Sequence, residues 1–60
     1  MTYEEIYSLR NSCITEEELE DIKSSSCCYR VEKIGSSPYE PKDFYKILFW
    51  EEDDIEVAVV

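Results

Sequence analysis

Histidine is absent from this 60-residue chain, glycine occurs once, and proline occurs twice. General acid–base and nucleophilic catalysis most often recruit histidine, so its absence argues against the common kinds of active site. A single glycine cannot build a glycine-rich phosphate-binding loop. The chain has only three cysteines, two of them adjacent, whereas zinc sites need three or four well-spaced ligands. We therefore expect a non-catalytic protein without a metal or other cofactor.

The cysteines, Cys13, Cys27 and Cys28, do not fit a disulfide framework, which uses even and spaced sets. The adjacent pair has two interpretations. It is either redox-active or metal-binding, or it supplies a small apolar residue at the start of a strand, which the composition favours. The first ten residues lack the basic and apolar regions of a signal peptide. No apolar run approaches the roughly 20 residues that span a bilayer. These features predict a cytoplasmic protein that does not bind membranes.

Length and composition predict one small folded domain over residues 1–60. Hydrophobic residues make up 43% of the chain and eight residues are aromatic, which argues against disorder. A chain of this length buries only about 60% of its unfolded surface, so its stability is expected to be marginal.

Negative charge dominates the chain, with fifteen acidic residues against six basic ones and a net charge of -9. Residues 1–26 carry a net -5, residues 27–50 a net +1, and residues 51–60 a net -5. Ten acids lie in two runs: Glu16, Glu17, Glu18, Glu20 and Asp21, then Glu51, Glu52, Asp53, Asp54 and Glu56.

Two capping-box motifs predict two helices near the N-terminus. Thr2 is followed three residues later by Glu5, and Thr15 by Glu18, and each threonine is flanked by apolar residues that can form a hydrophobic staple. We expect helices over 3–11 and 16–25. Three consecutive serines, which have low helix propensity, end the second helix.

The later part of the chain changes to a strand-like pattern. Alternation predicts strands over 27–34 and 55–60, and an aromatic-rich run predicts a central strand over 44–50. Residues 35–41 hold the glycine and both prolines and form a loop, and 51–54 form an acidic turn. Helices grouped before strands indicate an α+β fold. We expect the order ααβββ, with both helices on one face of a three-stranded antiparallel sheet.

The other face of that sheet has two interpretations. It is either a contact surface, in a homodimer or with a partner protein, or it shows only the ordinary exposure of apolar residues. That face is expected to keep some of five residues exposed: Tyr39, Tyr45, Ile47, Phe49 and Trp50.

The acids themselves suggest several chemistries. Glycosidase-like carboxylate pairs need a cleft that sixty residues hardly form, and the run over 51–56 lacks the ligand spacing and glycine of an EF-hand loop. A negative field opposes direct binding to nucleic acid. On a helix, however, Glu16 and Glu20 lie about 5–6 Å apart, a spacing similar to that of phosphates along a strand. The acids are therefore either a mimic of nucleic acid or a device for helix capping and solubility.

The size, charge and acidic clusters of the chain resemble those of small acidic inhibitors encoded by phages and mobile elements, of which anti-CRISPR proteins are the best example. The resemblance is one of overall profile and carries no family motif. It implies a stoichiometric inhibitor in the host bacterial cytoplasm. Such a protein blocks the basic groove of a CRISPR effector, or of another nuclease or polymerase. The predicted partner-binding residues are Glu16, Glu17, Glu20, Asp21, Trp50, Glu51, Glu52, Asp53, Asp54 and Glu56.

The alternative function is a non-catalytic interaction module or homodimer that uses the aromatic sheet face, with the acids serving only solubility. In an interface of that kind, an aromatic anchor such as Trp50 would dominate the binding energy.

Overall fold

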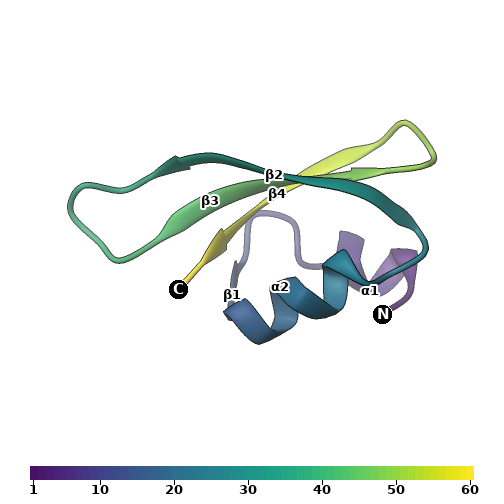
Figure 1. Ribbon diagram of the computed structural model, residues 1–60, viewed down its shortest axis with the longest axis horizontal. Helices are drawn as coiled ribbons and strands as arrows, with labels where there is room; N and C mark the ends of the chain where they lie inside the picture. The colour runs from purple at the N-terminus through teal and green to yellow at the C-terminus, as the bar shows by residue number, and fades with distance from the viewer.

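The computed structural model describes all residues from 1 to 60 as two helices and a four-stranded mixed sheet (Figure 1). The strands lie in the order β1-β4-β3-β2. The prediction of three antiparallel strands preceded by two helices is therefore wrong, although helices and strands are still segregated as in an α+β fold. The elements are α1 (Tyr3–Tyr7), β1 (Cys13–Ile14), α2 (Glu16–Lys23), β2 (Cys28–Ser36), β3 (Asp43–Phe49) and β4 (Asp54–Val59).

Both helices begin at the threonine caps that the sequence predicts. The hydroxyl of Thr2 accepts a hydrogen bond from the amide of Glu5, whose carboxylate accepts one from the amide of Thr2. Thr15 and Glu18 make the same reciprocal pair, at 3.2 and 3.1 Å. The two capping boxes are confirmed, and each satisfies two amides that a helix start leaves unpaired.

Both helices are shorter than expected because the backbone takes other partners. After Tyr7 the chain continues in tighter turns to Asn11, which adopts a left-handed conformation with φ of 61°. The amide of Asn11 donates to the carbonyl of Glu56, at 2.7 Å, so the chain leaves α1 to join the sheet. The second helix ends at Lys23, with Ser24 as its C-cap.

The fourth strand, β1, was not expected. It runs parallel to β4, with Cys13 opposite Ala58 and Ile14 opposite Val59. The amide of Ala58 donates to the carbonyl of Ser12, at 2.9 Å. Two residues are too few to show an alternating pattern, and their partners lie more than forty residues away. The strand therefore depends on tertiary pairing that local sequence does not reveal.

The three longer strands pair antiparallel, β2 with β3 and β3 with β4. The β2–β3 pair has two register shifts, and its hairpin extends well beyond the helices (Figure 1). The tight turn between β3 and β4 places Glu52 in the left-handed region, with φ of 65°.

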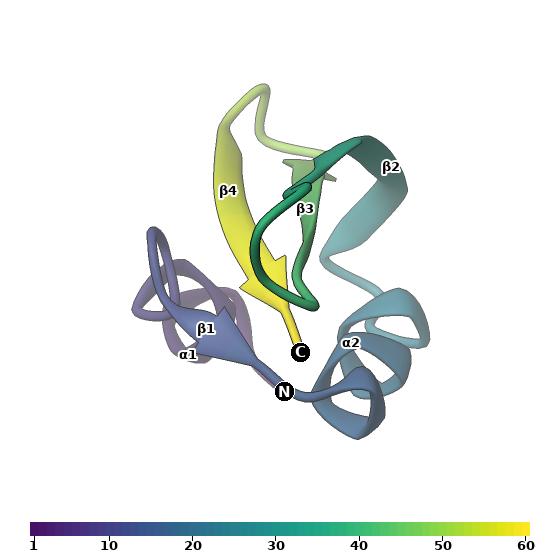
Figure 2. The same cartoon turned by 90° about the vertical axis from the view of Figure 1, so that its left-hand side faces the viewer.

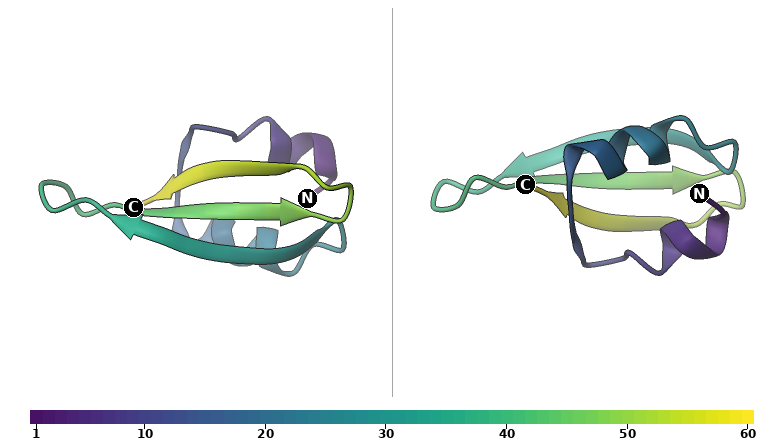
Figure 3. Two further views of the ribbon diagram at one scale, coloured as in Figure 1. Left: turned by 90° about the horizontal axis from the view of Figure 1, so that it is seen from above. Right: turned by 90° about the horizontal axis from the view of Figure 1, so that it is seen from below.

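Both helices lie on the same side of the three long strands, and the opposite side is open, as the two views in Figure 3 show. Figure 2 shows the two helices flanking the space beneath the curved sheet. Neither helix is long and apolar enough to cross a membrane. One core forms between the layers, from Ile6, Ile14, Leu19, Ile22, Ile47, Phe49, Ile55, Val57 and Val59.

The expected exposure of the central strand was partly wrong. Ile47 and Phe49 are buried, at 0% and 1% exposure, because alternate residues of β3 point toward the helices. Their neighbours Phe44, Lys46 and Leu48 occupy the alternate positions and point toward the open face. Trp50 and Tyr39, which lie beyond the ends of β3, are exposed as expected.

Candidate acidic interaction surface

Nearly all of the basic residues are already paired within the molecule. Five ion pairs have nitrogen–oxygen distances of 2.6 to 3.6 Å: Lys23–Glu20, Arg30–Glu32, Lys33–Asp43, Lys42–Glu40 and Lys46–Asp54. The remaining base, Arg10, lies over the ring of Tyr7, 5.1 Å from its centroid.

Ten of the fifteen acids consequently have no basic partner, since only five take part in ion pairs. Four of the five pairs involve residues of β2, β3 and the loop between them. Apart from Glu56 of β4, the acids without a basic partner lie on the helices and in the β3–β4 turn. The unpaired acids are Glu4, Glu5, Glu16, Glu17, Glu18, Asp21, Glu51, Glu52, Asp53 and Glu56.

The first acidic group, which we call the helix patch, consists of Glu16, Glu17, Glu20 and Asp21 on α2. All four are exposed. The three glutamates line a surface hollow of about 300 Å³ between α2 and Tyr45 of β3. The carboxylate of Glu20 is 3.5 Å from the ammonium of Lys23, which neutralises part of the patch. Glu16 and Glu20, which are four residues apart on α2, both line this hollow.

The second acidic group, the turn patch, consists of Glu51, Glu52, Asp53 and Asp54 at the β3–β4 turn. All four side chains are exposed. The carbonyl of Asp53 accepts a hydrogen bond from the amide of Phe49, at 3.0 Å, which closes the turn. Asp54 is 3.5 Å from Lys46, so the unpaired charge of this patch resides on the other three acids.

Glu56 was predicted to extend the turn patch, and its side chain is exposed on β4. It lies opposite Lys46 in the register of β3 and β4, on the open face of the sheet. Asp54, two residues earlier on β4 and opposite Leu48, faces the same side, whereas Glu51, Glu52 and Asp53 lie in the turn beyond the ladder.

Tyr3 belongs to the turn patch as well, a role that the sequence does not predict. Its hydroxyl donates a 2.5 Å hydrogen bond to a carboxylate oxygen of Asp53, and its ring packs edge-on against Phe49 at 4.8 Å. This hydrogen bond, together with desolvation and the charges of Asp53 and Glu51, raises the pKa of Tyr3 to about 12. Tyr3 therefore ties α1 to the turn and orders one of its carboxylates. The only local signal was the spacing of Tyr3 and Tyr7, which placed both on one helix face.

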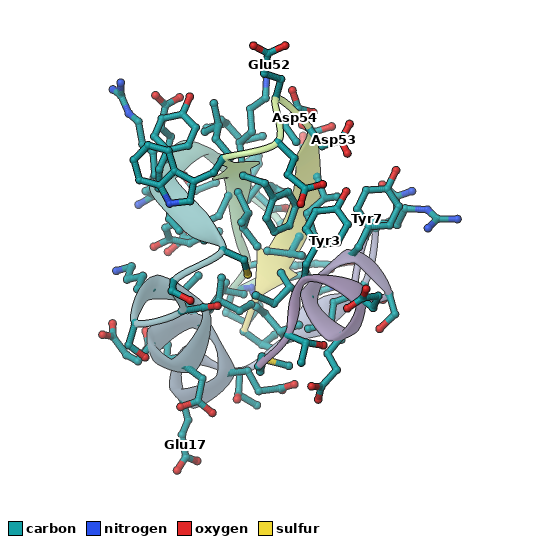
Figure 4. All side chains as sticks on the ribbon, turned by 90° about the vertical axis from the view of Figure 1, so that its right-hand side faces the viewer. Tyr3, Tyr7, Glu17, Glu52, Asp53 and Asp54 are labelled. Atoms are coloured by element: carbon teal, nitrogen blue, oxygen red, sulfur yellow. The ribbon has the colours of Figure 1, made fainter.

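The two acidic patches do not share one face. Figure 4, which looks along the longest axis, shows Glu52, Asp53 and Asp54 on one side of the molecule and Glu17 on the opposite side. Tyr3 and Tyr7 lie between them, close to the turn. A single flat partner surface cannot contact both patches at once, so each patch must be evaluated as a separate site.

Trp50 lies directly before the turn patch and is 67% exposed. It packs against Tyr29, with 4.9 Å between ring centroids, and its amide donates to the carbonyl of Cys27 at 3.2 Å. An exposed aromatic pair thus adjoins three unpaired carboxylates.

The cysteines are all free. Cys13 is exposed, whereas Cys27 and Cys28 are half-buried, and Cys27 lies 2.9 Å from the hydroxyl of Ser25. Burial raises the pKa of the Cys28 thiol, which disfavours the reactive thiolate. No group of three or more cysteine or acidic side chains has the arrangement of a metal site.

Comparisons with protein-family models, with curated proteins and with solved structures found no match for this chain.

Proposed function

We propose that this protein is a stoichiometric inhibitor whose acidic surface occupies the basic, nucleic-acid-binding groove of a host protein. The observation that carries the proposal is the charge imbalance: ten carboxylates lack a basic partner, while five of the six bases are paired within the molecule. Unpaired carboxylates keep like charges close together, which disfavours the compact state. A complementary basic surface would relieve that repulsion.

We infer that the turn patch is the main contact and that the helix patch contributes long-range attraction. Glu16 and Glu17 lie in the first turn of α2, where the helix macrodipole stabilises acidic residues, so their presence there needs no binding partner. The macrodipole does not account for Glu51 and Glu52, which lie next to an exposed tryptophan. Tryptophan is enriched among the residues that dominate binding energy, and here the charged rim beside it is already in place.

The partner class that fits is a protein with an arginine- and lysine-lined groove, such as a CRISPR effector or another nuclease or polymerase. Opposite charges would steer association and make it fast and sensitive to salt. We place this activity in the host bacterial cytoplasm, which is consistent with three free thiols.

The proposal is tested by capturing partners from bacterial lysate on the immobilised protein and eluting with competing DNA or RNA. We expect the eluted proteins to be nucleic-acid-binding, and the purified partner to lose activity at a one-to-one ratio. Inhibition should fail when the partner is loaded with nucleic acid beforehand. Elution of partners that do not bind nucleic acid would contradict the proposal.

A matched pair of variants separates the two patches. Glu51→Lys/Glu52→Lys and Glu16→Lys/Glu17→Lys change the net charge by the same amount. We expect the first pair to weaken binding at least about 100-fold, as loss of a central hot spot does. The second should weaken it only about 10-fold, through slower association. If inhibition survived both pairs, an acidic mimic would be the wrong mechanism.

A further inference from the structure

The β2–β3 hairpin projects from the body of the molecule, away from the helices and from the turn patch (Figure 1, Figure 3). It carries three of the seven exposed large apolar side chains of the molecule. Ile34 is 46% exposed, Phe44 is 41% exposed, and Tyr39 at the tip is 93% exposed. Ile34 and Phe44 line the same surface groove, so their exposure is clustered rather than scattered, as it is at contact surfaces.

A surface groove of about 280 Å³ lies at the base of this hairpin. Its apolar wall includes Ile34, Phe44 and Ala58, and its polar rim comprises Asn11, Ser12 and Glu56. An apolar floor with a few polar groups at the edge matches an amphipathic side chain, which has an apolar body and a hydroxyl at its end.

The hairpin is the one end of the molecule whose charge is balanced. Between residues 33 and 44 there are two bases and two acids, and they pair as Lys33–Asp43 at 3.6 Å and Lys42–Glu40 at 2.8 Å. A strongly basic partner would therefore find no unpaired charge on the hairpin itself. A second copy would meet one unpaired carboxylate beside the hairpin, that of Glu56 on the rim of the groove, which can accept a hydrogen bond from a phenol.

Distance also favours a second copy at this end. The molecule is 33 Å in its longest dimension, and the hairpin and the turn patch lie at its two ends (Figure 1). Charges separated by more than the Debye length, about 8 Å at physiological salt, interact weakly. Two copies that meet through their hairpins would keep their turn patches far apart.

We propose that two copies of this chain form a symmetric dimer in which Tyr39 of each copy inserts into the groove at Phe44 of the other. The tip is preorganised for such insertion, because the hydroxyl of Ser37 accepts hydrogen bonds from the amides of Tyr39 and Glu40, at 3.3 and 3.2 Å. Prolines at positions 38 and 41 further restrict the loop. The phenol of the inserted tyrosine would donate a hydrogen bond to the carboxylate of Glu56, or bond to Asn11 or Ser12, the other residues of the polar rim. Both contacts occur twice, as a twofold axis requires.

Sedimentation equilibrium of the full chain under reducing conditions tests this dimer. The interface is small, so we expect a dissociation constant on the order of 100 µM. The weight-average mass should rise from 7.1 kDa toward twice that value as concentration increases. Added salt should strengthen the dimer, because it screens the repulsion between two chains of charge -9.

Three variants of similar chemistry locate the interface. Tyr39→Ala, at a loop residue without a folding role, and Phe44→Thr, which preserves strand propensity, should each weaken the dimer at least about 10-fold, since truncating an anchor has this effect. Trp50→Ala removes another exposed aromatic residue, 67% exposed, at the other end of the sheet and should leave the dimer unchanged. A chain that stays monomeric at millimolar concentration and high salt would overturn the proposal, as would a dimer that both Tyr39→Ala and Phe44→Thr leave intact. Because binding to a basic partner weakens with salt, failure of this dimer and failure of the proposed inhibition are distinguishable.

Discussion

At the scale of single residues, some hydrogen bonds join near neighbours in the sequence and others join residues that only the fold brings together. The caps at Thr2 and Thr15 follow from partners three residues away, and they could be predicted from the sequence. The bond between Tyr3 and Asp53 joins residues fifty positions apart. No pattern in the sequence couples them, because the contact exists only once α1 docks beneath the end of the sheet.

Tyr3 makes stability depend on pH in the alkaline range. Folding raises its pKa from 10.0 to about 12, so the protonated phenol is favoured in the folded state. The resulting stabilisation is fully present below pH 10 and is lost as the pH rises through about 12. We therefore expect Tyr3→Phe to lower the melting temperature at neutral pH, and the difference from wild type to shrink above pH 10.

The matched control for this experiment is Tyr29→Phe, since the hydroxyl of Tyr29 makes no side-chain hydrogen bond to Asp53. Thermal unfolding followed by circular dichroism between neutral and alkaline pH measures both variants. Ultraviolet difference absorbance, which follows ionisation of the phenols, should show that Tyr3→Phe loses one tyrosine that ionises near pH 12. A difference that stays constant across the whole pH range would show that the hydrogen bond is not the source of the effect.

At the scale of elements, strong periodicity and caps located the helices and the three longer strands approximately. Their ends depended on competing partners, as at Asn11, whose amide leaves the helix to bond Glu56. The face of the central strand was misassigned because β3 is apolar on both sides, so that alternation could not identify which residues point inward. The two-residue strand β1 had no periodicity at all.

The contribution of β1 can be measured through Ile14, which is 1% exposed and belongs to the core. We expect Ile14→Ala to reduce the free energy of unfolding by about 2–4 kcal/mol, since it leaves a cavity where the strand meets β4. For a small domain this is a large share of the total stability. Urea denaturation at low protein concentration measures this free energy of unfolding.

Ile34→Ala is the matched control, because the same atoms are removed from a side chain that is 46% exposed. It should cost less than about 1 kcal/mol, in line with partial burial. Equal losses in the two variants would mean that β1 is not packed as the structure has it.

At the scale of the whole molecule, the sequence predicted the amount of charge and its division into two runs. It did not predict their separation, since that depends on how α2 and the β3–β4 turn are oriented around the core. Nor did it predict that most of the basic residues would form ion pairs on the sheet and the β2–β3 loop. The result is a molecule with a balanced hairpin at one end and unpaired carboxylates at the other end and on the helices.

This imbalance predicts that salt stabilises the fold. Ten acids without basic partners repel one another, and raising ionic strength screens them. If screening recovers about 1 kcal/mol, the melting temperature should rise by roughly 4–8 °C between low salt and half-molar sodium chloride.

Glu51→Gln/Glu52→Gln should raise the melting temperature at low salt and reduce its dependence on salt. Glu32→Gln/Asp54→Asn, which removes two paired acids, should not raise it, because each substitution leaves a base without its partner. A melting temperature that falls with salt in the wild type would mean that the five ion pairs, rather than the unpaired acids, dominate the electrostatics of this fold.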